Sequence, residues 1–384
     1  MLTTGLKWAS VALRMGVANI VPKSSSVVGL LCTFLLAGNS AAAATRDAGS
    51  WFKRTEYGLP GAQGLVSIDY FVFDAANRRL WVPAGNIGAV VIINADTEQV
   101  TSLSGFPTAR VDFRGKRPVM GPTSITLGDG VAYVGNRGDS TLCVIDVRTL
   151  KRGNCLALGS SSQGLAAAPD ALTYVAATRE LWVTRGVPPM GVSSIDRAIT
   201  VFDTSTPTDV RQKDAIPLGA SAEGFAVDNL RGRFYTSLEE QGDTVGIDVR
   251  THKVVVRFKS GCDEPHGLAL DVARGILFVA CVARVVSMDV AHDGQILGSI
   301  ETGKGLDNID YLPSRHLLYA AAADSAVLTI AHVDMHGRLH SVAVWPTEKG
   351  ARGVVVNSKA SAFVIDPYGG RILKLTPQVP LGSR

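Results

Sequence analysis

The sequence lacks the motifs that would identify an enzyme directly. It has no C-x-x-C pair, which excludes common zinc and covalent haem motifs. It also has no G-x-S-x-G elbow, phosphate loop or dinucleotide fingerprint. After residue 50 no long amphipathic helix is apparent, while short apolar runs alternate with Gly, Asp, Asn and Arg turns. These absences leave an all-β fold whose function has to be read from its surface.

The start of the chain has no acidic residue before Asp47. Three basic residues precede an apolar run at 27–37, and the alanine tract 41–44 follows. This order is typical of a secretory signal peptide, so we expect a leader at 1–44 that is cleaved after Ala43 or Ala44. The run is too short for a comfortable membrane span. Translation could start at Met1 or at Met15, and we expect a periplasmic or secreted product with no membrane span after cleavage.

Charge gives little sign of a nucleic-acid partner. Removing the three positive charges of the leader from the net charge of +4 leaves about +1 for residues 45–384. Binding to nucleic acid through phosphates needs a strongly basic surface, so we expect no such partner. Arg137 opens an Arg-Gly-Asp-Ser sequence, which we interpret as a chance match of common loop residues. We expect a monomer.

A repeat runs down most of the chain, and its third apolar stretch is the clearest ruler. That stretch ends at Asn94, Asp146, Asp203, Asp248 and Asp289, at intervals of 52, 57, 45 and 41 residues. The two long intervals contain insertions at 107–118 and 186–197. Without them the period is about 40 to 45 residues, the length of a four-stranded propeller blade.

The repeat predicts a single domain at 45–384, a seven-bladed β-propeller of four-stranded antiparallel blades. The blades are expected at 64–105, 119–159, 160–218, 219–260, 261–303, 304–350 and 351–377. The last unit supplies only three strands, and an open sheet edge invites aggregation. We therefore expect the segment 52–61 to pair with the last blade and close the ring.

The second strands of the units share an aromatic and aliphatic signature. They begin at Leu80, Tyr133, Leu181, Phe234, Leu277 and Leu318, with sequences such as Leu-Trp-Val-Pro and Tyr-Val-Gly-Asn. These sequences resemble the YVTN-type propellers, the YncE-like family of bacterial exported proteins. The resemblance covers 64–377 and implies the fold rather than an activity, because the shared residues build the blades.

Four cysteines remain after the leader, and an exported protein normally pairs its cysteines. Cys262 and Cys281 fall in loops that open on the same face of one blade, so we predict a disulfide between them. Cys143 and Cys155 fall on neighbouring strands, and they pair only if both side chains point to the same face.

Propeller sites usually lie over the central channel, where each innermost strand begins. Aligning the units places one residue per blade there: Gln63, Thr123, Gln163, Glu223, His266, Asp307 and Arg352. This ring mixes charges, so it can bind a small polar ligand through hydrogen bonds or merely solvate the channel mouth.

Two functions follow from this ring. The first is an exported, non-catalytic propeller that uses its channel-mouth face to bind a partner protein or a small polar ligand, without a cofactor. The alternative is a metal-dependent hydrolase or lactonase, with Glu223, His266 and Asp307 holding a divalent ion that activates water.

Overall fold

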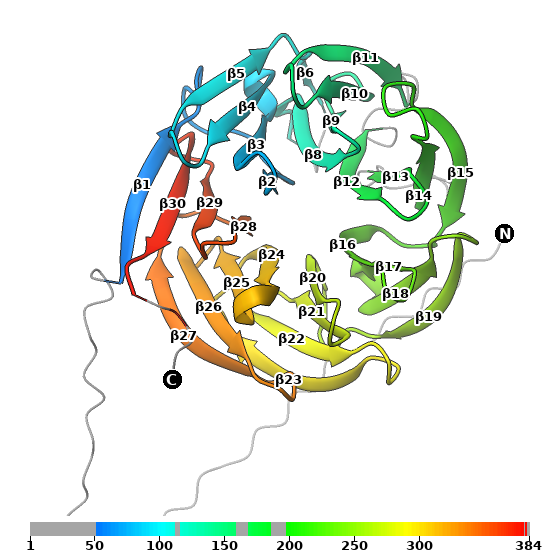
Figure 1. The fold of residues 1–384 in the computed structure, drawn as a ribbon, viewed down its shortest axis with the longest axis vertical. Helices are drawn as coiled ribbons and strands as arrows, with labels where there is room; N and C mark the ends of the chain where they lie inside the picture. The colour runs from blue at the N-terminus through cyan, green and yellow to red at the C-terminus, as the bar shows by residue number, and fades with distance from the viewer. Residues whose placement is uncertain (1–50, 112–115, 159–167, 186–196, 380, 382–384) are drawn as a thin grey trace, which may run out of the picture. The chain divides into compact units, whose positions relative to one another are not determined.

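The expected propeller is present. The computed structural model describes residues 51–111, 116–158, 168–185, 197–379 and 381, which all belong to one compact unit running from Arg46 to Arg384. Seven sheets of four antiparallel strands stand in a ring around a channel (Figure 1). The prediction of an all-β, seven-bladed propeller is therefore confirmed.

Within a blade, the strands follow one another outward from the channel in chain order. The first two blades contain β2 (Val72–Asp74), β3 (Arg79–Ala84), β4 (Ala89–Asn94) and β5 (Val100–Ser104), then β8 (Pro122–Gly128), β9 (Val131–Asn136), β10 (Thr141–Asp146) and β11 (Arg152–Ala157). The third and fourth contain β12 (Pro169–Val175), β13 (Glu180–Arg185), β14 (Ala198–Asp203) and β15 (Arg211–Pro217), then β16 (Ala222–Asp228), β17 (Arg233–Leu238), β18 (Asp243–Asp248) and β19 (Lys253–Lys259).

The remaining blades repeat the pattern. The fifth and sixth contain β20 (Leu268–Asp271), β21 (Ile276–Ala280), β22 (Arg284–Asp289) and β23 (Gln295–Glu301), then β24 (Leu306–Leu312), β25 (Leu317–Ala322), β26 (Val327–Val333) and β27 (Leu339–Pro346). The seventh contains β28 (Val354–Val356), β29 (Ala362–Asp366) and β30 (Arg371–Pro377). Short 3-10 turns follow three of these strands: η2 (Gly85–Ile87), η5 (Glu239–Gln241) and η6 (Pro313–Arg315).

The seventh blade takes its outer strand from the other end of the domain. Strand β1 (Phe52–Gly58) pairs antiparallel with β30 along its whole length, from Phe52 opposite Pro377 to Gly58 opposite Arg371. Arg371 also bonds Glu56 across the two strands, with 2.7 Å between Nη1 and Oε2. In this sheet β1 covers the edge of β30 that would otherwise be unpaired.

The predicted insertions lie between strands. The first, 107–118, includes β6 (Ala109–Arg110), which pairs with β7 (Val119–Met120) directly after the insertion, between the first and second blades. Most of the second insertion, 186–197, lies outside the described residues. Among the described residues, no helix is long and apolar enough to cross a membrane.

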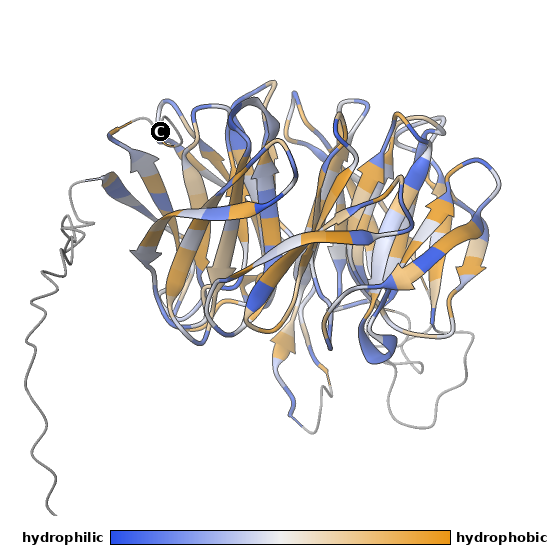
Figure 2. Cartoon of the chain, turned by 90° about the horizontal axis from the view of Figure 1, so that it is seen from below, coloured by the Kyte–Doolittle hydropathy of each residue, from blue (hydrophilic) through white to orange (hydrophobic). Residues whose placement is uncertain are grey.

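The core lies between blades and is built by the repeated second strand. Its aromatic residues are almost fully buried: Trp81, Tyr133, Trp182, Phe234, Phe278 and Tyr319. Trp182 packs on Phe234 of the next blade, with 4.6 Å between ring centroids. Figure 2 shows the apolar residues concentrated along the strands and the polar residues at the turns. The repeated aromatic signature therefore builds the ring, as expected.

Both predicted disulfides are present. Cys143 and Cys155 lie directly opposite each other on β10 and β11 and are bonded. Cys262, before β20, is bonded to Cys281, which follows β21. Each bond links two segments of one blade.

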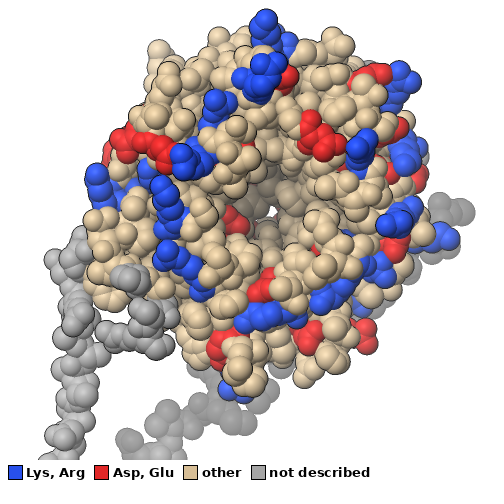
Figure 3. All heavy atoms as spheres, viewed as in Figure 1, with Lys and Arg blue, Asp and Glu red and all other residues tan. Residues whose placement is uncertain are grey.

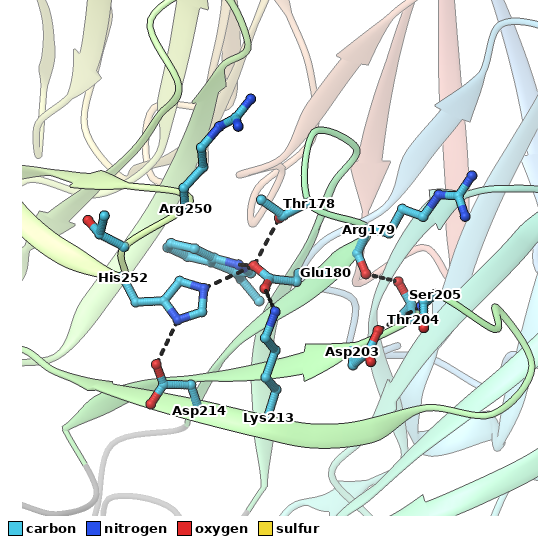
Figure 4. A network of polar contacts seen from close by, with 12 residues as sticks. Thr178, Arg179, Glu180, Asp203, Thr204, Ser205, Lys213, Asp214, Arg250 and His252 are labelled. Atoms are coloured by element: carbon cyan, nitrogen blue, oxygen red, sulfur yellow. Dashed lines mark hydrogen bonds and ion pairs between the residues drawn. The ribbon is translucent and has the colours of Figure 1, made fainter.

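A buried carboxylate joins the third and fourth blades (Figure 4). Glu180, on β13, is 1% exposed and accepts hydrogen bonds from Thr178, Trp182 and Lys213. Its Oε2 also lies 3.1 Å from Nε2 of His252, in the turn after β18, and Nδ1 of His252 lies 2.6 Å from Asp214 on β15. We call these six residues the Glu180 network. Because His252 belongs to the fourth blade and the others to the third, the network ties the two blades together.

Candidate functional site at the mouth of the channel

Neighbouring innermost strands approach closely where they begin, and glycine makes this possible. Gly224 has φ +63°, and a Cβ there would lie 2.5 Å from the Cα of Gly267 in the next blade. A Cβ on Gly267 would lie 2.3 Å from the carbonyl oxygen of Asp307. Only glycine fits these contacts. The glycine that follows Glu223 and His266 in the sequence thus has a packing reason.

Backbone hydrogen bonds between blades hold the strand starts at one level. The amide of Gly267 donates to the carbonyl of Asp307 at 2.9 Å, and that of Asn308 donates to the carbonyl of Arg352 at 3.1 Å. On the other side of the ring, the amide of Asp69 donates to the carbonyl of Thr123 at 3.1 Å. Hydrogen bonds between the backbones of neighbouring blades therefore fix the positions of adjacent site residues relative to one another.

Five charged side chains form a continuous chain of ion pairs around the channel. Arg137 pairs with Asp170 and, at 3.1 Å, with Asp69. Arg352 pairs with the other oxygen of Asp69 at 3.1 Å and with Asp307 at 2.7 Å. The five residues of this series of ion pairs come from five different blades. With Glu223 and His266, which lie on the remaining two, we call these seven residues the mouth cluster.

Arg137 is the best anchored member of the cluster. It follows β9, its side chain is 11% exposed, and its Nε donates to the carbonyl of Pro169 at 3.2 Å. The next residue, Gly138, is in tight contact with another loop, since a Cβ there would lie 2.4 Å from the carbonyl oxygen of Pro107. The Arg-Gly pair thus places a guanidinium between two buried carboxylates instead of in a solvated loop.

Glu223 differs from the other acids of the cluster. It is partly buried, and among the described residues its carboxyl makes no hydrogen bond or ion pair. Burial, together with the neighbouring charges of Asp307 and Asp69, raises the pKa of Glu223 to about 8 against the smaller lowering effect of Arg137. At neutral pH this side chain is therefore mostly an uncharged carboxylic acid.

The acidic residues of the cluster also raise the pKa values of a neighbouring arginine and of a tyrosine. Asp307 and Asp69 raise the pKa of Arg352 above its ordinary value, so its guanidinium stays charged. Burial, reinforced by the charge of Glu223, raises the pKa of Tyr70 well above its ordinary value. Tyr70 therefore stays a neutral phenol.

Tyr70 extends across the channel below the cluster. It comes from the first blade, yet the amide of Gly224 in the fourth blade donates to its hydroxyl at 3.3 Å. Its ring also stacks on Phe225, with centroids 5.7 Å apart. The tyrosine thus connects the first and fourth blades across the channel.

A cavity of about 470 Å³ opens beside the cluster, next to Arg352. It lies between the first and seventh blades and is lined by Asn86, by Ser67 and by apolar side chains that include Tyr368. Its size falls within the usual range for small-molecule sites.

The sequence identified four members of this cluster: Glu223, His266, Asp307 and Arg352. Thr123 is fully buried, and within the described residues its hydroxyl has no hydrogen-bond partner. Gln63 is exposed in the loop between β1 and β2, and Asp69 supplies the contact from the first blade instead. Gln163 lies outside the described residues, and Asp170 supplies the contact from the third blade.

Aligning the repeat units of the sequence did not identify Asp69, Arg137 and Asp170 as site residues, and the structure shows why. Gln63 precedes a glycine, as Glu223 does, but β2 begins only at Val72. Asp170 follows a proline and has no glycine beside it to mark the close approach. Arg137 belongs to the turn after a second strand, which the alignment of innermost strands leaves out.

The metal hypothesis gains no support from the arrangement. No group of three or more His, Cys, Asp and Glu side chains within the described ranges is placed to hold a metal ion. Asp307, one of the three proposed ligands, is already paired with Arg352. A divalent ion at Glu223, His266 and Asp307 stays a prediction that metal analysis can test.

Comparisons with known proteins place the fold. No family model matches the chain, and no curated protein matches it. A chain of a solved mitotic checkpoint complex is similar over 91% of this chain and 100% of that one, with a TM-score of 0.64 and 13% identity. A streptogramin B lyase is similar over 87% of this chain and 100% of the other, with a TM-score of 0.63 and 10% identity. The RRP9 WD40 repeats match over 86% and 98%, with a TM-score of 0.63 and 10% identity.

These likenesses show a β-propeller and nothing finer. At such low identity, proteins that share a propeller fold carry unrelated functions. The resemblance to the YVTN type has no family model behind it and stays a prediction.

Proposed function

We propose that this protein is an exported, non-catalytic binding protein, and that its mouth cluster holds a small polar ligand carrying an ammonium group. The observation that supports this is Glu223, a partly buried carboxyl with no partner among the described residues. A cation beside Glu223 would favour its ionised form and would lower its pKa toward the ordinary range.

The charge balance of the cluster favours a cation over an anion. Its four carboxyl groups face two guanidinium groups and the imidazole of His266, and both guanidinium groups are already shared between carboxylates. An incoming anion would meet the remaining acids and find each arginine engaged. An ammonium group would instead supply the missing positive charge.

Binding should release a proton. At pH 7 Glu223 is mostly protonated, because its pKa is raised to about 8. An ammonium ligand that pairs with the carboxylate displaces that proton into the buffer. This coupling separates the proposed site from ordinary surface binding of a cation.

The test is titration calorimetry on the exported chain with both disulfides intact. Putrescine, choline and ethanolamine serve as amine probes, with glycerol and citrate as neutral and anionic controls. We expect an amine to bind with a heat that changes between buffers of different ionisation enthalpy. Glu223→Gln should weaken binding by about tenfold or more, as expected for loss of a buried charge pair.

Asp293→Asn is the matched control, because Asp293 is exposed in the turn after β22. It should bind like the unaltered protein. Equal binding of citrate and the amines, or an unaltered affinity in Glu223→Gln, would refute the proposal. Removal of metal with EDTA should leave amine binding unchanged, and loss of binding on EDTA treatment would favour the metal alternative.

Export is part of the same proposal. The leader pattern at 1–44 and the two disulfides support it, since disulfides persist in oxidising compartments. Mass analysis of the product should find its first residue at Ala44 or Thr45. A product that keeps residues 1–44 and free thiols would contradict export.

A further inference from the structure

The lower part of the channel contains a second cavity, separate from the one beside Arg352. Its volume is about 440 Å³, and innermost strands of the first, third to seventh blades line it. Figure 3 shows the centre of the ring hollowed. Tyr70 lies at one end of this cavity, and Phe73 and Tyr311 line it farther along the innermost strands.

The walls of this cavity combine apolar side chains with polar groups, whereas the mouth cluster is formed by ionisable side chains. Aliphatic residues from β16, β20, β24 and β28 contribute, together with the rings of Phe73 and Phe225. An apolar ligand body would lose contact with water here, which contributes about 25 cal/mol for each Å² of apolar surface removed from water. The apolar part of the wall therefore suits an aromatic or aliphatic group of a ligand.

One acid in this wall has no cationic partner. Oδ2 of Asp310 accepts a hydrogen bond from the amide of Val356 at 2.7 Å, and Oδ1 accepts one from the amide of Tyr311 at 2.8 Å. Within the described ranges the carboxyl forms no ion pair with Lys, Arg or His. Each oxygen keeps a further lone pair. Burial raises the pKa of Asp310 to about 7, as expected for an acid without a counter-charge.

Other polar groups of the wall are also unsatisfied. The hydroxyl of Thr173 and the amide nitrogen of Asn308 are buried and have no hydrogen-bond partner in the described part of the chain. The aromatic rings provide a second source of attraction for a cation, because the face of a ring is electronegative. The wall thus combines apolar side chains, an acid without a cationic partner and aromatic faces.

We infer that this lower cavity binds a small amphipathic amine, with its apolar body between the innermost strands and its ammonium group at Asp310. The site shares Asp69, Tyr70 and Phe225 with the mouth cluster and the Tyr70 region, and its binding acid is a different residue. It does not depend on the ligand proposed for the mouth cluster.

Three probes with one carbon skeleton test this inference: 4-phenylbutylamine, 4-phenyl-1-butanol and 4-phenylbutyrate. Calorimetry on the exported chain should find the amine bound about tenfold more tightly than the alcohol, as expected for one partly desolvated ion pair, and the carboxylate more weakly than either. Equal affinity for the three probes would overturn the inference.

Two variants separate the head group from the body. Asp310→Asn should bring the amine close to the affinity of the alcohol, while Val227→Phe fills the cavity from β16 and should weaken both compounds by about tenfold or more. Asp293→Asn is again the control. Retention of amine preference in Asp310→Asn, or of binding in a folded Val227→Phe, would overturn the inference.

The two sites are distinguishable by their variants. Glu223→Gln should leave phenylbutylamine binding at the lower cavity intact, and Asp310→Asn should leave putrescine binding at the mouth intact. If Glu223→Gln alone abolishes binding of phenylbutylamine, then the amine binds at the mouth and the lower site is refuted.

Discussion

Two glutamates in this propeller, the buried Glu180 and the partly buried Glu223, have opposite surroundings. Glu180 accepts hydrogen bonds from Thr178, Trp182 and Lys213 and contacts His252, whereas Glu223 makes no such contact among the described residues. Burial opposes ionisation of Glu180, yet hydrogen bonds led by that of Lys213 outweigh it and lower its pKa. Burial raises the pKa of Glu223 without opposition of that strength.

The difference distinguishes a carboxylate that stabilises the fold from a carboxyl group that is available to bind a ligand. Glu180 is 1% exposed and its carboxylate already contacts four polar groups, so the Glu180 network serves the contact between blades. A carboxyl held without a partner beside other acids carries an energetic penalty that a ligand can relieve. Buried or partly buried carboxyl groups with incomplete hydrogen bonding are therefore the best candidates for ligand binding in this ring.

The largest expected effect comes from breaking the mouth cluster at Arg137. Arg137→Met leaves Asp69 and Asp170 buried without the guanidinium that they share, which should lower the free energy of unfolding by about 3 to 5 kcal/mol. Urea unfolding measures the loss. A loss below about 1 kcal/mol, the size of an exposed ion pair, would show that solvent already screens these charges.

Breaking the Glu180 network should have the next largest effect. Glu180→Gln removes the charge that faces Lys213 and His252, and we expect a loss of about 2 to 3 kcal/mol at pH 7. Because the pKa of Glu180 is lowered, its contribution is present above its ordinary pKa of 4.5 and is lost as pH falls through the folded value. The loss caused by Glu180→Gln should accordingly shrink in acid, and an effect that does not change with pH would contradict this account.

The same substitution at Glu223 should act in the opposite direction. Since the folded pKa is raised, the folded protein holds an extra proton between pH 4.5 and about 8, and the free energy of unfolding falls as pH rises through that range. Glu223→Gln cannot ionise, so at pH 9 it should be more stable than the unaltered protein by about 1 to 3 kcal/mol. Thermal unfolding at pH 5 and pH 9 measures this, and a variant that is less stable at pH 9 would remove the contrast.

The smallest effect is expected at Tyr70. Tyr70→Phe keeps the ring stacked on Phe225 and loses only the acceptor for the amide of Gly224, so a loss of about 0.5 to 1 kcal/mol is expected. Urea unfolding of this variant can be compared with that of Tyr133→Phe, a buried tyrosine whose hydroxyl has no hydrogen-bond partner in the described residues. A larger loss in Tyr133→Phe would mean that the bond across the channel contributes nothing.

The repeat predicted the ring because each blade needs the same local features. The apolar stretches that end at Asp146, Asp203, Asp248 and Asp289 are third strands in the structure. The disulfide between Cys262 and Cys281 followed from the blade geometry alone. Such features are set by neighbouring residues in one unit, and sequence periodicity records them.

The pairing of charges across blades could not be predicted in the same way. Asp69 bonds Arg137 and Arg352, which lie 68 and 283 residues away. No local pattern links these residues, because their contact depends on the closed ring. A glycine follows Glu223 and His266 in the sequence and indicated that two innermost strands begin there. No glycine follows Asp69 or Asp170, so the sequence contains no such indication for them.

The pairing of β1 with β30 sets an order of events for folding. The ion pair between Glu56 and Arg371 spans 315 residues. Contacts of such long range form slowly, since the intervening chain must first be ordered. During synthesis β1 is made first and its partner β30 is made last. The strand β1 therefore stays without this partner until the seventh blade has been synthesised, and the ring closes only after that.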